Sequence, residues 1–177
     1  MKHLKLYENF IGEAEERKLW RNTSQYFLEN LVRDGKVTAE ENRFISFSLD
    51  EDSGGQDNFG DTRIEFDFNE LVNNQGAREI YYEPDFFEEY PEISRYVTGY
   101  SSEQDYYDNQ DYDNAEEAHE QFELAWEDNL ESYEPEQEVV IKELRYVPGM
   151  IKSIFIKHPD KRVTDLLDKK GIPYSTE

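Results

Sequence analysis

The residues whose types and spacing best suit chemistry are Arg21, Ser46, Ser48, Glu136 and Glu138. An arginine presents a rigid fork of N–H donors that fits a diphosphate. Serine hydroxyls two residues apart on a strand lie on one face, where they can hold a sugar or orient a reacting group. Glu136 and Glu138 also share a face of an extended chain. One carboxylate would therefore stabilise a developing positive charge while the other orients or deprotonates an acceptor.

Each of these residues also has an ordinary structural interpretation. Arg21 is a candidate surface ion-pair partner in so acidic a chain. Serines are common in strands, and an E-x-E pair arises often by chance among 42 Asp and Glu residues. The order of the set along the chain, together with its position on predicted strands, favours the chemical interpretation.

Other chemistries find little support in the sequence. The chain has no cysteine, which excludes disulfides, thiolate nucleophiles and thiolate zinc sites. Its three histidines, His3, His119 and His158, have no spacing suited to a metal or a catalytic triad. Neither a G-x-S-x-G elbow, a Walker loop nor a G-x-G-x-x-G motif occurs. No metal is therefore expected in the site.

Short strands are predicted to position the candidate residues. Composition and alternation predict strands at Lys18–Asn22, Arg43–Ser48, Thr62–Phe68, Arg78–Tyr82, Glu138–Lys142 and Met150–Lys157. Helices are predicted from Ser24 to Gly35, within Asp85–Tyr96, over Ala115–Tyr133 and around Val163–Leu167. Because these elements do not alternate as in βαβ units, an α+β fold is expected.

The length of 177 residues predicts one domain with appendages. Residues 1–17 are predicted to form an amphipathic or targeting segment, and residues 18–177 the domain, with an acidic, tyrosine-rich insertion at about 100–114. No stretch of 18 apolar residues occurs, so no membrane span is predicted, and no apolar secretory signal is expected at the N-terminus.

The formal net charge of -23 argues against binding nucleic acid through a basic face. Between Tyr96 and Ile141 there is no Lys or Arg, whereas 15 acidic residues lie between Glu103 and Glu138. This 103–138 segment is either solvated surface, a docking surface for a basic partner, or a mimic of nucleic acid.

Three motifs in order, L-W-R-N-T-S at Leu19–Ser24, I-S-F-S at Ile45–Ser48 and E-Q-E at Glu136–Glu138, resemble the R-S-E class of ADP-ribosyltransferases. The resemblance implies an α+β fold with a split β-sheet core, surrounding helices and NAD as co-substrate. It implies that Arg21 binds NAD, that Ser46 and Ser48 line the site, and that Glu138 is catalytic. Glu136 would favour transfer to arginine of a host protein. The chain differs from the family pattern at Trp20, Asn22 and Phe47.

The N-terminal sequence resembles the capsid-targeting peptides of internal head proteins in tailed phages. Leu6-Tyr7-Glu8 and Ile11-Gly12-Glu13 both fit the pattern after which a prohead protease cuts. This resemblance implies a protein of the phage head interior that later acts in the host cytoplasm. The alternative is an N-terminal docking helix, in a protein that is simply in the host cytoplasm. Two rival functions stay open, a non-catalytic acidic inhibitor that mimics nucleic acid and a structural component of the phage head.

Overall fold

The computed structural model describes residues 17–41, 43–49, 60–81, 84–99, 105, 108 and 138–177, and they form a mixed α+β fold. The strands are β1 (Lys18–Thr23), β2 (Lys36–Thr38), β3 (Ile45–Ser48), β4 (Thr62–Asp67), β5 (Arg78–Glu79), β6 (Glu138–Ile141), β7 (Glu143–Arg145), β8 (Ile151–Ile156) and β9 (Ser175–Thr176). The helices are α1 (Gln25–Asp34), α2 (Pro84–Glu89), α3 (Pro91–Thr98) and α6 (Lys161–Lys170), with a π-helical turn η4 (Glu70–Asn74). The predicted α+β class is confirmed.

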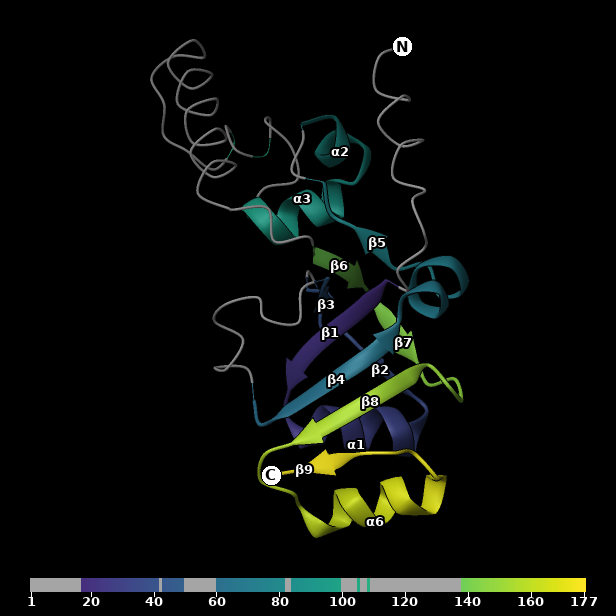
Figure 1. Cartoon of the computed structure of the whole chain (residues 1–177). Coiled ribbons are helices and arrows are strands. Elements are labelled where there is room, and N and C mark those ends of the chain that lie inside the picture. The colour runs from purple at the N-terminus through teal and green to yellow at the C-terminus, as the bar shows by residue number, and fades with distance from the viewer. Residues whose placement is uncertain are drawn as a thin grey trace.

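Seven strands form one sheet in the order β5-β6-β3-β1-β4-β8-β9, and β2 pairs with β7 in a small second sheet. All pairs in the large sheet are antiparallel except β8 with β9. Figure 1 shows α2 and α3 at the β5–β6 end of this sheet, and α1 with α6 at the β8–β9 end.

The large sheet is nearly divided between β1 and β3. Six register pairs join β1 to β4, and four join β3 to β6. Within the described residues a single pair, Trp20 with Ser48, joins β1 to β3. The two strands therefore diverge beyond this pair, which gives the split core that the sequence resemblance implied.

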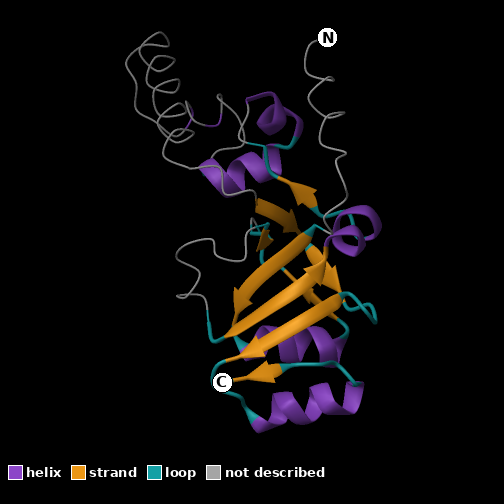
Figure 2. Cartoon of the chain, in the orientation of Figure 1, coloured by secondary structure: helices purple, strands orange, loops and turns teal. Residues whose placement is uncertain are grey.

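One face of the sheet packs against α1 and α6. Alternating residues of β1 and β4, such as Leu19, Ile64 and Phe66, are fully buried in this core. Helix α1 supplies an apolar stripe, and it ends at Gly35, whose φ of 77° suits a left-handed cap. Burial of each such side chain contributes about 1.5–3 kcal/mol. Figure 2 shows the two helices near the C-terminal end of the chain, one behind the strands and one below the last strand.

A second apolar cluster covers the opposite face at the β5–β6 end. Its buried members are Ile80, Phe87, Ile93 and Val140, drawn from β6, α2, α3 and the segment after β5. Further along that same face, side chains from β1, β4 and β8 stay partly exposed, Phe155 at 41%. The two faces of the sheet are thus covered at different ends.

Most predicted elements within the described residues are confirmed, with shorter ends for several strands. β3 begins at Ile45 rather than Arg43, and β5 ends at Glu79. Ser24 is the N-cap of α1 as predicted, although its side chain makes no capping hydrogen bond. The predictions for residues 1–16 and Ala115–Tyr133, and most of the predicted insertion at about 100–114, lie outside the described residues. No helix in the described part of the chain is both long and apolar enough to span a membrane.

Candidate active site

The structure brings four of the five predicted site residues onto three adjacent strands. Arg21 lies on β1, Ser46 and Ser48 on β3, and Glu138 on β6, and these strands are neighbours in the sheet. The fifth, Glu136, lies outside the described residues. Because the strands are neighbours, residues 25 to 117 positions apart in sequence are gathered in one region.

A row of paired residues sets the face on which these side chains lie. Ser48 is directly opposite both Trp20 and Glu138, so these three side chains point to the same side of the sheet. Ser48 is buried, with 7% of its surface exposed, whereas Glu138 is half-buried. Glu138 begins β6, and its carbonyl accepts a hydrogen bond from the Ile80 amide at 2.8 Å. The backbone that carries this carboxylate is therefore held on both sides.

Arg21 occupies the place where β1 and β3 diverge. It alternates with Trp20 and so starts from the opposite face of β1. Its Nη1 donates a hydrogen bond of 2.6 Å to the carbonyl oxygen of Ser46. Since the β1–β3 ladder ends at Trp20, the guanidinium supplies that carbonyl with a donor where no strand partner does.

The guanidinium of Arg21 is held tightly but is not fully satisfied. It stacks over the ring of Phe27 on α1, with its central carbon 4.7 Å from the ring centroid. Its Nε is buried and has no hydrogen-bond partner. Buried donors are almost always paired, so this N–H marks a position where an acceptor is expected.

Burial also changes the acidity of this group. Loss of solvation lowers the pKa of Arg21 below its ordinary value, whereas electrostatic interactions with Tyr96 and Glu138 act in the opposite direction. The cation is therefore close enough to Glu138 for the two charges to interact. Such a pair of opposite charges beside an unpaired donor suits a ligand with both anionic and developing cationic parts.

Sequence reasoning missed two residues of this site. Phe27 falls within the helix predicted from Ser24 to Gly35, and Tyr96 ends the partly helical segment predicted at Asp85–Tyr96; neither residue was given a functional role. Tyr96 lies on α3, where its ring packs edge-on against Phe44 with 5.3 Å between centroids. An aromatic residue just after the arginine-bearing strand was the available signal for Phe27. Nothing in the sequence pointed to Tyr96, because only the packing of α3 brings it near β1.

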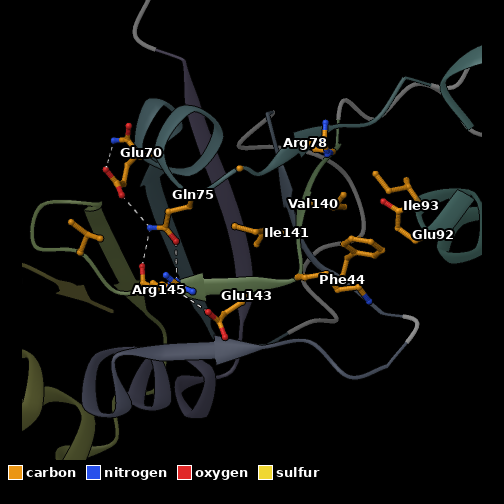
Figure 3. A pocket seen from close by; sticks show the side chains of 14 residues that line it. Phe44, Glu70, Gln75, Arg78, Glu92, Ile93, Val140, Ile141, Glu143 and Arg145 are labelled. Carbon is orange, nitrogen blue, oxygen red and sulfur yellow. Dashed lines mark hydrogen bonds and ion pairs between the residues drawn. The ribbon is translucent and has the colours of Figure 1, made fainter. Parts of the chain in front are cut away.

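A cleft of about 550 Å³ lies beside the end of β6 and β7. Figure 3 shows its walls, in which the amide of Gln75 bridges Glu70 and the backbone of Arg145. Gln75 both donates to the Arg145 carbonyl and accepts from the Arg145 amide, each at 2.9 Å. Neither Arg21 nor Glu138 lines this cleft. Among the described residues, no group of three metal-ligating side chains is found.

No protein-family model matches the sequence, and no curated protein sequence matches it significantly. Among solved structures, the chain is similar to DarT of Thermus sp. 2.9 in complex with NAD+. The TM-score is 0.40 and the identity 12%, with 94% of this chain and 98% of that chain covered. DarT in complex with carba-NAD+ gives a TM-score of 0.39 and 13% identity, with 92% and 96% covered. Similarity this low leaves the function to be argued from the residues of the chain.

Little of the acidic 103–138 segment lies within the described residues. Asp105, Asp108 and Glu138 are described, and Asp105 forms an ion pair of 2.9 Å with Arg95 on α3. This contact ties one carboxylate to the domain. The docking or nucleic-acid-mimic role of the segment stays a prediction.

Proposed function

We propose that the chain transfers ADP-ribose from NAD to a macromolecular acceptor, with Arg21 binding the dinucleotide and Glu138 acting as the catalytic glutamate. The observation that carries the proposal is that Arg21, Ser48 and Glu138 lie on neighbouring strands where the sheet divides, with Arg21 close enough to Glu138 for their charges to interact although it starts from the other face of β1. These are the residues that the order of motifs in the sequence selects.

The unpaired Nε of Arg21 supports a role in binding an anionic ligand. A phosphate or ribose oxygen of NAD would accept its hydrogen bond, which the protein alone leaves unmade. Phe27 and the Ser46 carbonyl fix the other parts of the guanidinium, so its orientation is set before the ligand arrives. Ser46 and Ser48 would line the site beside it.

In the proposed reaction, the bond between C1′ of the ribose and the nicotinamide nitrogen breaks, and nicotinamide leaves with the bonding electrons. The carboxylate of Glu138 stabilises the oxocarbenium-like charge on the sugar. A nucleophilic nitrogen of the acceptor then bonds to C1′ and gives its proton to a base. We assign this second role to Glu136, which would favour an arginine acceptor.

The N-terminal resemblance extends the proposal to the setting of the reaction. A protein packaged in a phage head would act on a host protein as soon as it reached the host cytoplasm. The negative charge of the chain would attract a basic acceptor surface to the site.

The test is incubation of the chain with NAD labelled in the adenylate part and a bacterial lysate, with nicotinamide release measured in parallel. Transfer of label by the unchanged chain is expected, with a loss of at least about a hundredfold in Glu138→Gln, as for removal of a group that stabilises transition-state charge. Asp165→Asn on the exposed face of α6 is the matched control and should retain activity. A folded chain that releases no nicotinamide and transfers no label would refute the proposal.

A further inference from the structure

A groove of about 550 Å³ runs along β5, the edge strand of the large sheet. Its lining comes from β5, η4, α2 and the segments that join them, and it includes Val72, Ala77, Glu79, Tyr81, Phe86 and Tyr90. None of the site residues predicted from sequence lines this groove, and the proposed reaction assigns it no role. An edge strand beside an apolar groove is a surface that proteins usually cover with a further segment.

One wall of the groove is a row of three aromatic rings, Tyr81, Phe86 and Tyr90, here called the aromatic row. The ring of Phe86 lies between the other two, with 5.7 Å between centroids to Tyr81 and 4.9 Å to Tyr90. Arg78 stacks on Tyr90 at 4.3 Å and donates a hydrogen bond of 2.9 Å to its hydroxyl. Tyr81 keeps 41% of its surface exposed. The row therefore offers ordered apolar surface to a segment with apolar side chains on one face.

Residues 1–16 join the described part of the chain beside this groove. Arg17 donates hydrogen bonds of 2.8 and 3.0 Å from its two terminal nitrogens to the two carboxylate oxygens of Glu79, which lines the groove. The guanidinium also lies 4.1 Å from the centroid of the Phe68 ring. Such a bidentate pair fixes the end of the segment at the groove. Sixteen residues span about 24 Å as a helix and about 54 Å when extended, so the segment is long enough to follow α2, whose six residues span about 9 Å.

The sequence of residues 1–16 suits the groove in its apolar side chains and in its charge. The apolar residues recur at helical spacing: Leu6, Phe10, Ile11 and Ala14. Lys2 and Lys5, the only lysines of the segment, lie far along the chain from Arg17. Glu89 of α2 lines the groove and is exposed, so its carboxylate is available to these cations. Apolar contact and opposite charges would therefore act together.

We propose that this groove is the docking site of the chain's own residues 1–16. Phe10 and Ile11 pack against the aromatic row, and the pair of Arg17 with Glu79 anchors the end of the segment. The docked segment covers the open edge of β5. Docking is a contact within the chain and does not depend on the transferase reaction.

The test measures whether residues 1–16 hold one position in the full chain. The chain has no cysteine, so Asn9→Cys and Glu88→Cys introduce the only two sites for nitroxide spin labels. Double electron–electron resonance should give a single narrow distribution of distances between the two labels. Leu6→Asp together with Ile11→Asp keeps the length of the segment but removes its apolar contacts. The ratio of docked to free segment should then fall at least about tenfold, and the distribution should broaden.

A matched pair of variants tests the groove itself. Tyr81→Asp places a charge in the aromatic row and should also broaden the distribution. Tyr26→Asp should leave it narrow, because Tyr26 is 68% exposed on α1 and does not line the groove. Thermal unfolding followed by circular dichroism checks that both variants fold. If Tyr81→Asp does not fold, the comparison with Leu6→Asp and Ile11→Asp decides alone, since it changes no residue of the groove.

Three results would overturn the proposal. The first is a broad distribution in the labelled chain without further changes. The second is a distribution that stays narrow in Leu6→Asp with Ile11→Asp or in folded Tyr81→Asp. The third is a dipolar signal between chains that carry one label each, which would place the segment of a second copy in the groove. All three readouts are made without NAD, so failure of the transferase reaction leaves them unaffected.

Discussion

Replacement of Gly60 by alanine adds one methyl group, but it should lower the free energy of unfolding far more than so small a change usually does. Gly60 precedes β4 with a φ of 143°. A Cβ added there would lie 2.7 Å from the Ser24 amide nitrogen and closer still to the carbonyl of Thr23. Those atoms are backbone at the junction of β1 and α1, so no side chain can move aside.

The expected cost has two parts that a control separates. The positive φ costs a non-glycine residue about 1–3 kcal/mol, and overpacking against fixed atoms adds about 1–3 kcal/mol. Gly149 also has a positive φ, of 87°, but a Cβ there meets nothing within 4 Å. In Gly149→Ala the free energy of unfolding should therefore fall only by the conformational part, about 1–2 kcal/mol.

The assay is thermal and urea unfolding followed by circular dichroism. For a chain of this size, a decrease of about 3–5 kcal/mol in the free energy of unfolding lowers Tm by about 10 °C or more. The Tm of Gly149→Ala should fall by less than half of that. Equal midpoints for the two variants would refute the close approach of Gly60 to Thr23, since only that contact distinguishes them.

Three further outcomes are expected. Phe27→Leu should raise the KM for NAD by about fivefold, because the guanidinium of Arg21 loses its stacking partner, whereas Phe27→Tyr should keep the KM of the unchanged chain. Steady-state nicotinamide release measures both values, and an unchanged KM in Phe27→Leu would count against the stacking. A hydrogen bond from Lys152, and next a hydrogen bond from a backbone amide, lower the pKa of Asp67 below its ordinary value. The ionised carboxylate therefore stabilises the fold at pH values above the ordinary carboxyl pKa of about 4. Asp67→Asn should therefore lower the free energy of unfolding by about 1–2 kcal/mol at pH 7. In unfolding curves this difference should shrink as the pH falls from 4 towards 2, and a difference that does not change with pH would contradict the prediction. Because the chain and NAD both carry net negative charge, raising NaCl from about 20 to 200 mM should lower the KM for NAD by about twofold, whereas a rise in KM would show a locally attractive site.

The sequence predicted the longer elements because their signals are local. The strand at Lys18, the helix ending at Gly35 and the strand at Thr62 each follow from alternation, apolar spacing or a stop residue, and each is confirmed. Within β4, however, alternation places Glu65 on the face opposite the apolar Ile64 and Phe66, and the structure buries it with 8% exposure. Its ion pair with Lys18 and hydrogen bond from Ser153 come from neighbouring strands and leave no local mark.

Two very short strands that depend on distant partners were not predicted. β2 and β7 have three residues each, and they are strands because Lys36, Val37 and Thr38 pair with residues more than 100 positions away. The site shows the same division: the motifs named Arg21, Ser48 and Glu138, but the Arg21–Phe27 stacking and the approach of Tyr96 arise only from packing.

The single Trp20–Ser48 pair has a mechanical consequence. A fully paired sheet opens as one cooperative unit, whereas a sheet with a poorly paired boundary between two strands, here called the seam, opens along that boundary first. Here the seam runs between the strand that carries Arg21 and the strands that carry Ser48 and Glu138. A ligand that contacts both β1 and the β3–β6 strands would stabilise the closed arrangement of the two. Amide hydrogens of β1 and β3 should therefore exchange with solvent more slowly when the ligand is bound. The strand pair with the fewest register pairs among the described residues is thus the one that the proposed ligand would strengthen.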